Sequence, residues 1–223
     1  PATDVSFSQG PMDVLDHSCS KLGFGGKMCI DGTAKMPEET DDRYDTRTIP
    51  FSLSEASLRQ AFPEIEGVNC SLLARAIPVL LVAVRKERKS QVKDLHKRLS
   101  RLAGMEAIKM ILYVEHTVDP QDLPVALWRF CNNLDPRRDH FLEEYDSPDA
   151  PGKMRACLGL DGTLKTRELD DFQRDWPNII VADDATIAAV DAKWEQLEIG
   201  PFLPSPSRKF KGQMYGEEAV AGS

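Results

Sequence analysis

Two pairs of neighbouring residues, Asp16-His17 and Asp139-His140, have the side-chain types that proton transfer and metal binding require. Adjacent residues on a helix or a strand point in different directions, so the two side chains of such a pair seldom meet. The four histidines of the chain are scattered and have no zinc-ligand spacing. The sequence therefore assigns no residue to catalysis and none to a metal site.

Three segments carry groups that could bind a small anion. Gly23–Lys27 could line up backbone N–H groups, but it lacks the spacing of a nucleotide-phosphate loop. The basic run Arg85–Lys89 is interrupted by a glutamate, and a solvated loop is the alternative there. The pair Arg137-Arg138 stands between two aspartates, so local salt bridges compete with anion binding. These alternatives stay open at the level of the sequence.

The motif Asp-Gly-Thr-x-Lys occurs twice in the chain. It occupies residues 31–35 and 161–165, and each copy directly follows an apolar residue, Ile30 or Leu160. Asp and Gly tolerate the left-handed backbone of a tight turn, so one copy alone could simply end a strand. The repetition predicts the end of one structural unit followed by a whole second unit.

Composition narrows the class of protein. The net charge of −8 argues against a nucleic-acid partner, because nucleic-acid binding needs a positive surface. The five cysteines have no CxxC spacing and mostly apolar neighbours, so we expect reduced thiols in a cytoplasmic protein. Since no apolar run reaches the roughly 18 residues that cross a bilayer, no transmembrane segment is expected.

The elements that must position these groups alternate between strand and helix. Apolar runs predict strands, and apolar residues at steps of three and four predict helices. Strands are expected over residues 72–84, 108–115, 156–160 and 178–181, and helices over residues 54–62, 90–103, 119–131 and 183–197. This order predicts an α/β fold of three layers, with a mostly parallel or mixed sheet and helices on both faces.

Several motifs of the chain resemble those of one known family. The most specific is Asn132–Asp139, which reads Asn-Asn-Leu-Asp-Pro-Arg-Arg-Asp. Together with Phe62–Ile65, Ile108-Lys109 and the final Asp191-x-x-Trp194 helix, it resembles the C-terminal domain of UbiD-family decarboxylases. Gly10–Lys35 is similar to the usual ending of that domain.

The resemblance implies an organisation for the whole chain. Residues 1–50 would be the largely irregular tail end of a preceding UbiD-like C-terminal domain. Residues 51–200 would form a second, complete copy of that α/β domain, and residues 201–223 a C-terminal tail. We therefore expect a C-terminal part of a longer decarboxylase in which this domain is duplicated.

The resemblance also implies an activity for the longer protein. UbiD-family carboxy-lyases act on aromatic or α,β-unsaturated acids, here with a hydroxybenzoate of ubiquinone or menaquinone biosynthesis as the expected substrate. They use prenylated FMN held with a divalent metal and often potassium. Their catalytic acids and metal ligands lie in a central barrel domain that has no counterpart in this sequence. This part of the enzyme is therefore expected to be inactive alone and to hold no cofactor.

One site residue and two kinds of partner follow from the resemblance. Lys109 matches a family lysine that reaches the cofactor phosphate, although a lysine flanking a buried strand can also snorkel. The expected partners are the upstream domains of the same polypeptide and further subunits of a homo-oligomer. Phe202, Phe210 and Tyr215 could reach a neighbouring subunit or cover their own domain. The alternative is a stand-alone α/β domain that binds a small anion or a cofactor phosphate.

Overall fold

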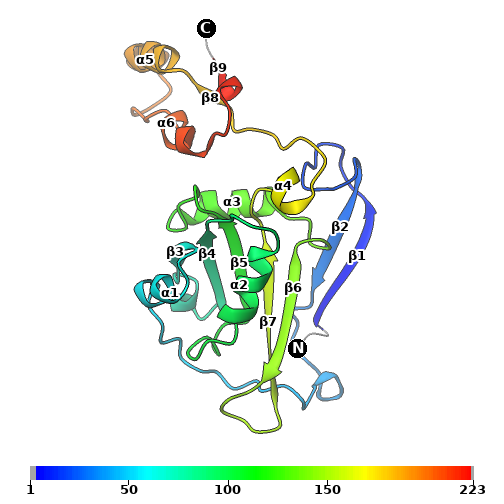
Figure 1. Cartoon of the computed structure of the whole chain (residues 1–223). Coiled ribbons are helices and arrows are strands. Elements are labelled where there is room, and N and C mark those ends of the chain that lie inside the picture. Colours follow the sequence, from blue (N-terminus) through cyan, green and yellow to red (C-terminus); the bar gives the residue numbers. More distant parts are fainter. Residues whose placement is uncertain (1–3, 222–223) are drawn as a thin grey trace. The chain divides into compact units, whose positions relative to one another are not determined.

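The computed structural model describes residues 4–221, which divide into two compact units at the Arg174–Asp175 bond (Figure 1). A five-stranded mixed sheet of order β3-β4-β5-β7-β6 forms the core of the first unit. Its strands are β3 (Ile65–Asn69), β4 (Val79–Val84), β5 (Met110–Glu115), β6 (His140–Asp146) and β7 (Met154–Asp161). The three central strands are parallel, and both edge strands are antiparallel to their neighbours. The predicted α/β class is confirmed.

Helices cover the sheet on both faces, because its central strands are apolar on both sides. In β4, Leu80 and Val82 enter one core while Leu81 and Ala83 enter the other. Helices α1 (Glu55–Ala61) and α2 (Gln91–Leu99) contribute Leu58, Leu95 and Leu99 to the first core; α3 (Leu123–Asn133) contributes Ala126 and Phe130 to the second. A short α4 (Arg167–Asp170) follows β7.

The helix starts show how local hydrogen bonds override simple capping rules. α1 begins as the sequence predicts, with the Ser54 hydroxyl accepting from Ser57 N at 3.1 Å. Ser90, the first residue of the helix predicted over 90–103, takes a left-handed backbone with φ 59° and does not cap α2 with its side chain. The Gln91 side chain orders the loop before the helix, since its Oε1 accepts from Glu87 N at 2.6 Å and from Arg88 N at 3.1 Å. The start of α3 is capped by Asp122 and not by Asp119.

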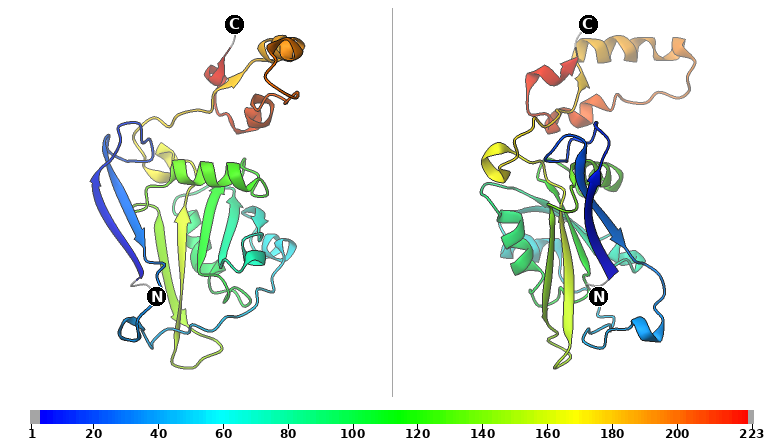
Figure 2. Two further views of the ribbon diagram at one scale, coloured as in Figure 1. Left: turned by 180° about the vertical axis from the view of Figure 1, so that it is seen from behind. Right: turned by 90° about the vertical axis from the view of Figure 1, so that its right-hand side faces the viewer.

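Residues 1–50, expected to be largely irregular, contain an antiparallel hairpin of β1 (Val5–Pro11) and β2 (Phe24–Ile30). Its apolar side chains pack against the second core, on the face that α3 also covers (Figure 2). Gly25 and Gly26 are adjacent in β2, and glycine is unfavourable in strands, so the sequence did not predict this strand. Packing nevertheless requires both glycines. A Cβ on Gly25 would lie 2.3 Å from Cys19 Sγ, and one on Gly26 would lie 2.1 Å from Asp135 Oδ1.

The second unit contains the rest of the helices and a two-stranded parallel sheet. Strands β8 (Val181–Ala182) and β9 (Val220–Ala221) pair, and helices α5 (Asp184–Lys193) and α6 (Ser207–Phe210) lie between them in the sequence. Asp183, the first residue of the helix predicted over 183–197, caps α5, its carboxylate accepting from Thr186 N at 2.6 Å. Many apolar side chains of this unit are exposed, among them Ile180, Ile199 and Leu203. Short 3₁₀ helices cover residues 37–39 and 73–75 in the first unit and 194–197, 211–213 and 217–219 in the second.

Over residues 4–221, none of the helices combines the length and the apolar character that crossing a bilayer requires.

Candidate functional site at the carboxyl edge of the sheet

The carboxyl ends of the three parallel strands bring charged residues to one edge of the sheet. Glu115 ends β5, Asp161 ends β7, and Lys86 lies two residues beyond β4. Residues 132–139, which comprise the end of α3 and the loop after it, reach the same edge and carry the Asn-Asn-Leu-Asp-Pro-Arg-Arg-Asp motif. Ligands of open α/β sheets bind outside the carboxyl ends of the strands, so this edge is the first place to look for a site.

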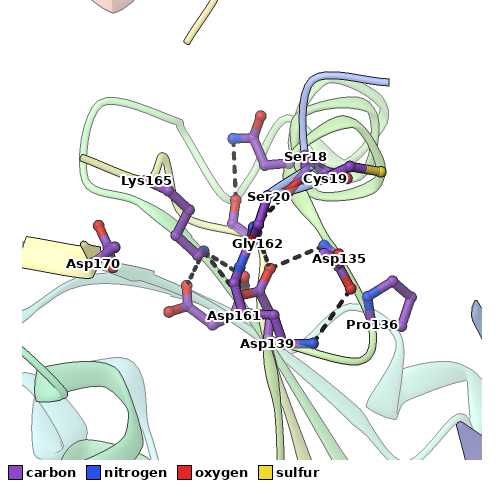
Figure 3. A network of polar contacts seen from close by, with 12 residues as sticks. Ser18, Cys19, Ser20, Asp135, Pro136, Asp139, Asp161, Gly162, Lys165 and Asp170 are labelled. Carbon is purple, nitrogen blue, oxygen red and sulfur yellow. Dashed lines mark hydrogen bonds and ion pairs between the residues drawn. The ribbon is translucent and has the colours of Figure 1, made fainter. Parts of the chain in front are cut away.

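The second Asp-Gly-Thr-x-Lys motif forms a buried turn at this edge. Asp161 Oδ1 accepts from Thr163 N at 2.9 Å and from Thr163 Oγ1 at 2.6 Å. Lys165 Nζ donates to the carbonyls of Asp161 and Thr163 at 2.8 and 2.7 Å, and it lies 3.2 Å from Asp161 Oδ1. Figure 3 shows this ammonium facing both Asp161 and Asp139. The lysine thus closes the turn, and none of its hydrogen-bonding capacity is directed outward.

Lys86, in the loop after β4, also binds this turn through its ammonium group. Its Nζ donates to both carboxylate oxygens of Asp170 at 2.9 Å, to Thr163 Oγ1 at 3.1 Å and to Leu164 O at 2.8 Å. Burial lowers the pKa of its ammonium, and Lys165 adds to that effect while Asp161 and Asp170 oppose it. Lys86 therefore ties the β4 loop to the turn and to α4.

The Asp135–Asp139 segment is folded on itself by its own aspartates. Asp135 Oδ1 accepts from Arg137 N at 3.0 Å, and Asp139 Oδ2 accepts from Asp135 N at 2.9 Å. Arg138 pairs with Asp139 at 2.6 Å and donates to Ser18 O at 2.5 Å. Of the two arginines considered as anion ligands, Arg138 is therefore engaged in a local salt bridge, whereas Arg137 lies exposed.

A second cluster of polar side chains surrounds Glu115. Arg129 pairs with Glu115, with its Nε 3.1 Å from Oε1, and Leu164 N donates to Oε2 at 3.3 Å. Asn133 Nδ2 donates to Gly162 O at 3.2 Å. Asn133, the second residue of the distinctive Asn-Asn pair, therefore fixes the second turn against α3, whereas Asn132 is exposed.

A cavity of about 170 Å³ lies at the start of α2. Its charged lining residues include Lys86, Arg138, Asp139, Asp161 and Lys165. Burial raises the pKa of Asp139, although Lys165 and Arg138 oppose that rise. Burial also acts to raise the pKa of Asp161, but Lys165 and Lys86 outweigh it and lower the pKa. Lys86, Arg138 and Lys165 thus each face an aspartate. These ion pairs connect the loops that follow β4, α3 and β7.

The first copy of the motif forms the same turn in an exposed setting. Asp31 Oδ1 accepts from Thr33 N at 2.9 Å and from Thr33 Oγ1 at 2.6 Å, and Lys35 Nζ lies 2.5 Å from Asp31 Oδ2. Hydrogen bonding to Lys35 and to Thr33 holds the pKa of Asp31 well below its usual range. The sequence repeat is therefore also a repeat of local structure.

Lys109 lies at the opposite edge of the sheet, just before β5. It lines a cavity of about 410 Å³ with Val79, Asp31 and Asp45 among the other walls. Partial desolvation, together with nearby Arg155, lowers the pKa of its ammonium. Within residues 4–221 its ammonium has no hydrogen bond or ion pair. Lys109 is thus separate from the carboxyl-edge cluster, and its role as a phosphate ligand stays a prediction.

The remaining candidates have local partners. His17 lies 3.4 Å from Asn133 Oδ1, and His140 Nδ1 lies 2.8 Å from Pro136 O while its ring stacks on Phe7. The Gly23–Lys27 segment is mostly strand β2 and does not form a phosphate loop. In the part of the chain that the structure describes, no three His, Cys, Asp or Glu side chains gather as a metal site would need, and the five cysteines are free.

Sequence reasoning missed one buried ion pair. Arg155 Nη2 lies 2.7 Å from Asp45 Oδ2, and the two residues are 1% and 6% exposed. Asp45 Oδ2 also accepts from Ser147 Oγ at 2.7 Å. An arginine inside an otherwise apolar strand was the available signal, since such a residue is buried only when paired.

Comparison with known proteins gives a family match. Residues 50–151 match the model of the 3-octaprenyl-4-hydroxybenzoate carboxy-lyase C-terminal domain. An uncharacterised protein of Helicobacter pylori is 30% identical over 176 residues, which are 76% of this chain and 24% of the relative. The chain spans about a quarter of the length of the curated relatives that it matches.

Two solved structures are similar over part of this chain. Vanillic acid decarboxylase of Sedimentibacter hydroxybenzoicus, in closed form, is 18% identical with a TM-score of 0.49, over 66% of this chain and 31% of that chain. The UbiD-class enzyme HmfF of Pelotomaculum thermopropionicum, in an evolved dimeric form in complex with prFMN, is 16% identical with a TM-score of 0.39. That match covers 55% of this chain and 25% of that chain.

Proposed function

Because residues 50–151 belong to the UbiD carboxy-lyase C-terminal domain family, we propose that this chain is the C-terminal, assembly-forming part of a longer UbiD-type carboxy-lyase. The longer enzyme would act on an aromatic or unsaturated acid, with a quinone-pathway hydroxybenzoate as the first candidate. Prenylated FMN, bound with a divalent metal and potassium, would act there as the electron sink for decarboxylation.

The observation that carries this proposal is the carboxyl-edge cluster. It occupies the place where an α/β domain usually binds its ligand, yet its buried cations all face aspartates within the fold. The cavity at Lys109 has carboxylates on its wall beside that one lysine. Carboxylates beside a single lysine would repel a flavin phosphate, which supports placing the reaction in the rest of the longer polypeptide.

An assembly role is supported by the apolar surface of the second unit. Ile199, Phe202 and Leu203 are 65%, 53% and 66% exposed, a large apolar area for one short segment. Phe202 also stacks edge-on against Trp194 at 5.6 Å, and Tyr215 donates to Trp176 O at 2.6 Å. These aromatic residues therefore have contacts inside their own unit and still leave apolar surface for another subunit.

The test compares the longer polypeptide with a version that lacks residues 51–223. Both would be produced together with the prenyltransferase that makes the cofactor. We expect both to retain the yellow flavin, and only the complete protein to keep its full oligomeric mass by sedimentation. Loss of flavin with unchanged mass in the shortened protein would contradict the proposed role.

The alternative, a domain that binds a cofactor phosphate through Lys109, is tested on the 223-residue chain itself. Lys109→Ala is compared with Lys97→Ala, a matched change of an exposed lysine on α2. The proposal expects FMN not to bind any of the three proteins in equilibrium dialysis. Stoichiometric binding that only Lys109→Ala abolishes would favour the alternative.

A further inference from the structure

The N-terminal hairpin repeats the last hairpin of the main sheet, strand for strand. β1 pairs antiparallel with β2 so that Val5 faces Ile30, and β6 pairs with β7 so that His140 faces Leu160. Ile30 and Leu160 are the apolar residues before the two Asp-Gly-Thr-x-Lys turns. Val5 therefore corresponds to His140, and Asp4 corresponds to Asp139.

The hydrogen bonds and ion pairs agree with this correspondence. Asp31 N donates to Asp4 O at 2.8 Å, and Asp161 N donates to Asp139 O at 2.8 Å. Lys35 Nζ lies 3.1 Å from Asp4 Oδ1, and Lys165 Nζ lies 3.8 Å from Asp139 Oδ1. The likeness extends well beyond the five-residue motif, because neither aspartate belongs to it.

The two hairpins differ at the edge of their second strand, which is the side of β2 away from β1 and the side of β7 away from β6. β7 pairs on that side with β5 in parallel, and the amides of Leu158 and Gly162 donate to Lys109 O and Tyr113 O at 2.9 and 3.0 Å. Over residues 4–221, β2 belongs to a sheet of only two strands. Its amides at the corresponding positions, Met28 and Gly32, therefore face an open edge.

The side chains of the first hairpin lack the cover that the second has. Ile30 is 47% exposed, whereas the corresponding Leu160 is 1% exposed. A Cβ on Gly162 would lie 3.0 Å from Phe130 Cα in α3, so that glycine is required by a helix packed on top of it. A Cβ on Gly32 would meet nothing within 4 Å, and its φ is not left-handed. Within residues 4–221, therefore, neither packing nor backbone conformation requires a glycine at position 32.

We propose that the outer edge of β2 is filled by a parallel strand of a preceding copy of the same domain. That strand takes the register that β5 takes on β7, opposite Met28–Asp31, and a helix equivalent to α3 covers Gly32. An open edge with exposed apolar residues is otherwise a site of aggregation, which gives a physical reason for it to be covered. This inference rests on the proposed longer enzyme, which would supply the preceding copy.

The packing of the hairpin indicates how the two copies meet. Phe7 of β1 stacks on His140 of β6 at 3.6 Å. Leu142 is the equivalent of Phe7, and Val5 is the equivalent of His140. These two residues, one from each hairpin, line the same cavity. Residues of one hairpin therefore face their equivalents in the other, as in an isologous interface. The two copies would meet through equivalent faces within one polypeptide.

Amide hydrogen exchange tests the edge directly, residue by residue. In the 223-residue chain the outward amides of Met28, Ile30 and Gly32 should exchange near unprotected rates, while those of Leu158 and Gly162 are protected. In the longer polypeptide we expect the three outward amides to slow by about 100-fold or more. Unchanged fast exchange there would overturn the inference. So would concentration-dependent protection in the short chain, because a second copy of this chain would then be the occupant.

A pair of glycine substitutions gives a second readout. Gly32→Ala should leave the urea midpoint of the 223-residue chain unchanged and lower that of the longer polypeptide, whereas Gly162→Ala should lower both. No effect of Gly32→Ala in the longer polypeptide would count against the covering helix. These stability measurements are independent of catalysis. Protection without decarboxylase activity would reject only the proposed function, and activity without protection would reject only this inference.

Discussion

The buried polar residues of the sheet are held neutral or paired by their immediate neighbours. His96 is fully buried, with Nδ1 3.0 Å from the Tyr113 hydroxyl and Nε2 3.2 Å from Cys157 O. Burial lowers the pKa of His96 to about 4. Burial also raises the pKa of the Cys157 thiol to about 12, so neither side chain is charged at neutral pH. His96 lies in the segment 90–103 that the sequence predicts as a helix, and it faces the core of the fold and not solvent.

His96 should make the stability of the first unit depend on pH. Its pKa is about 6.5 in the unfolded chain and about 4 in the fold, so unfolding takes up a proton between these values. The contribution, of the order of 3 kcal/mol, is complete above pH 6.5 and is lost as the pH falls to 4. Urea unfolding of the wild type and of His96→Gln, measured at pH 7 and pH 4.5, should show a smaller loss in the variant.

The matched control for this change is His116→Gln, because His116 is exposed. That variant should keep the pH dependence of the wild type. Equal slopes for all three proteins would mean that folding leaves the pKa of His96 unchanged.

At the level of elements, the irregular stretch between β2 and α1 contains one buried charged residue, Asp45, which ties it to the main sheet. Asp45 joins Arg155 of β7 and Ser147, while Arg47 Nε donates to its other oxygen at 2.9 Å. An isolated bridge between Tyr44 and Met154 runs beside this contact. The long irregular stretch after β2 is thereby anchored to an edge of the main sheet.

Removing the charge of Asp45 should therefore destabilise the fold strongly. Asp45→Asn leaves the Arg155 guanidinium buried without its counterion, a change that costs about 3 kcal/mol or more. Asp42→Asn, at an exposed position three residues away, should change the free energy of unfolding by less than about 0.5 kcal/mol. Equilibrium urea unfolding at pH 7 measures both, and similar values for the two variants would refute the anchoring role.

At the scale of the whole molecule, the two units differ in what holds them together. Both clusters of buried apolar residues lie within residues 5–160 of the first unit. The second unit, residues 175–223, has few buried apolar side chains, Val181 and Ile187 among them. Small units bury too little surface to be stable alone, so the second unit is expected to depend on other contacts.

Cutting the chain at the boundary between the units should separate a stable part from an unstable one. We expect residues 1–174 to unfold cooperatively at the urea midpoint of the complete chain. Residues 175–223 alone should show no cooperative transition by circular dichroism. A molten first unit, with dispersed NMR signals lost, would show that its core needs the second unit.

The sequence by itself determined the fold class, the family resemblance and the repeated turn. These depend on local patterns: apolar runs for the central strands, steps of three and four for the helices, and Asp-Gly-Thr-x-Lys for a turn whose hydrogen bonds form within five residues. The carboxyl-edge residues could be named as motifs, but their mutual pairing could not. Only the tertiary structure decided that Lys86 pairs with Asp170 and that Lys165 faces Asp139 as well as Asp161 of its own turn.

The edge strands β1, β2 and β6 were also decided by the tertiary structure. Their sequences carry glycines or polar residues that local propensity disfavours in strands, and pairing with a neighbouring strand overrides that propensity. The same holds for the correspondence of the two hairpins. It rests on Asp4 and Asp139, whose equivalence no sequence pattern marks, because hydrogen-bond register is a property of two strands and not of one.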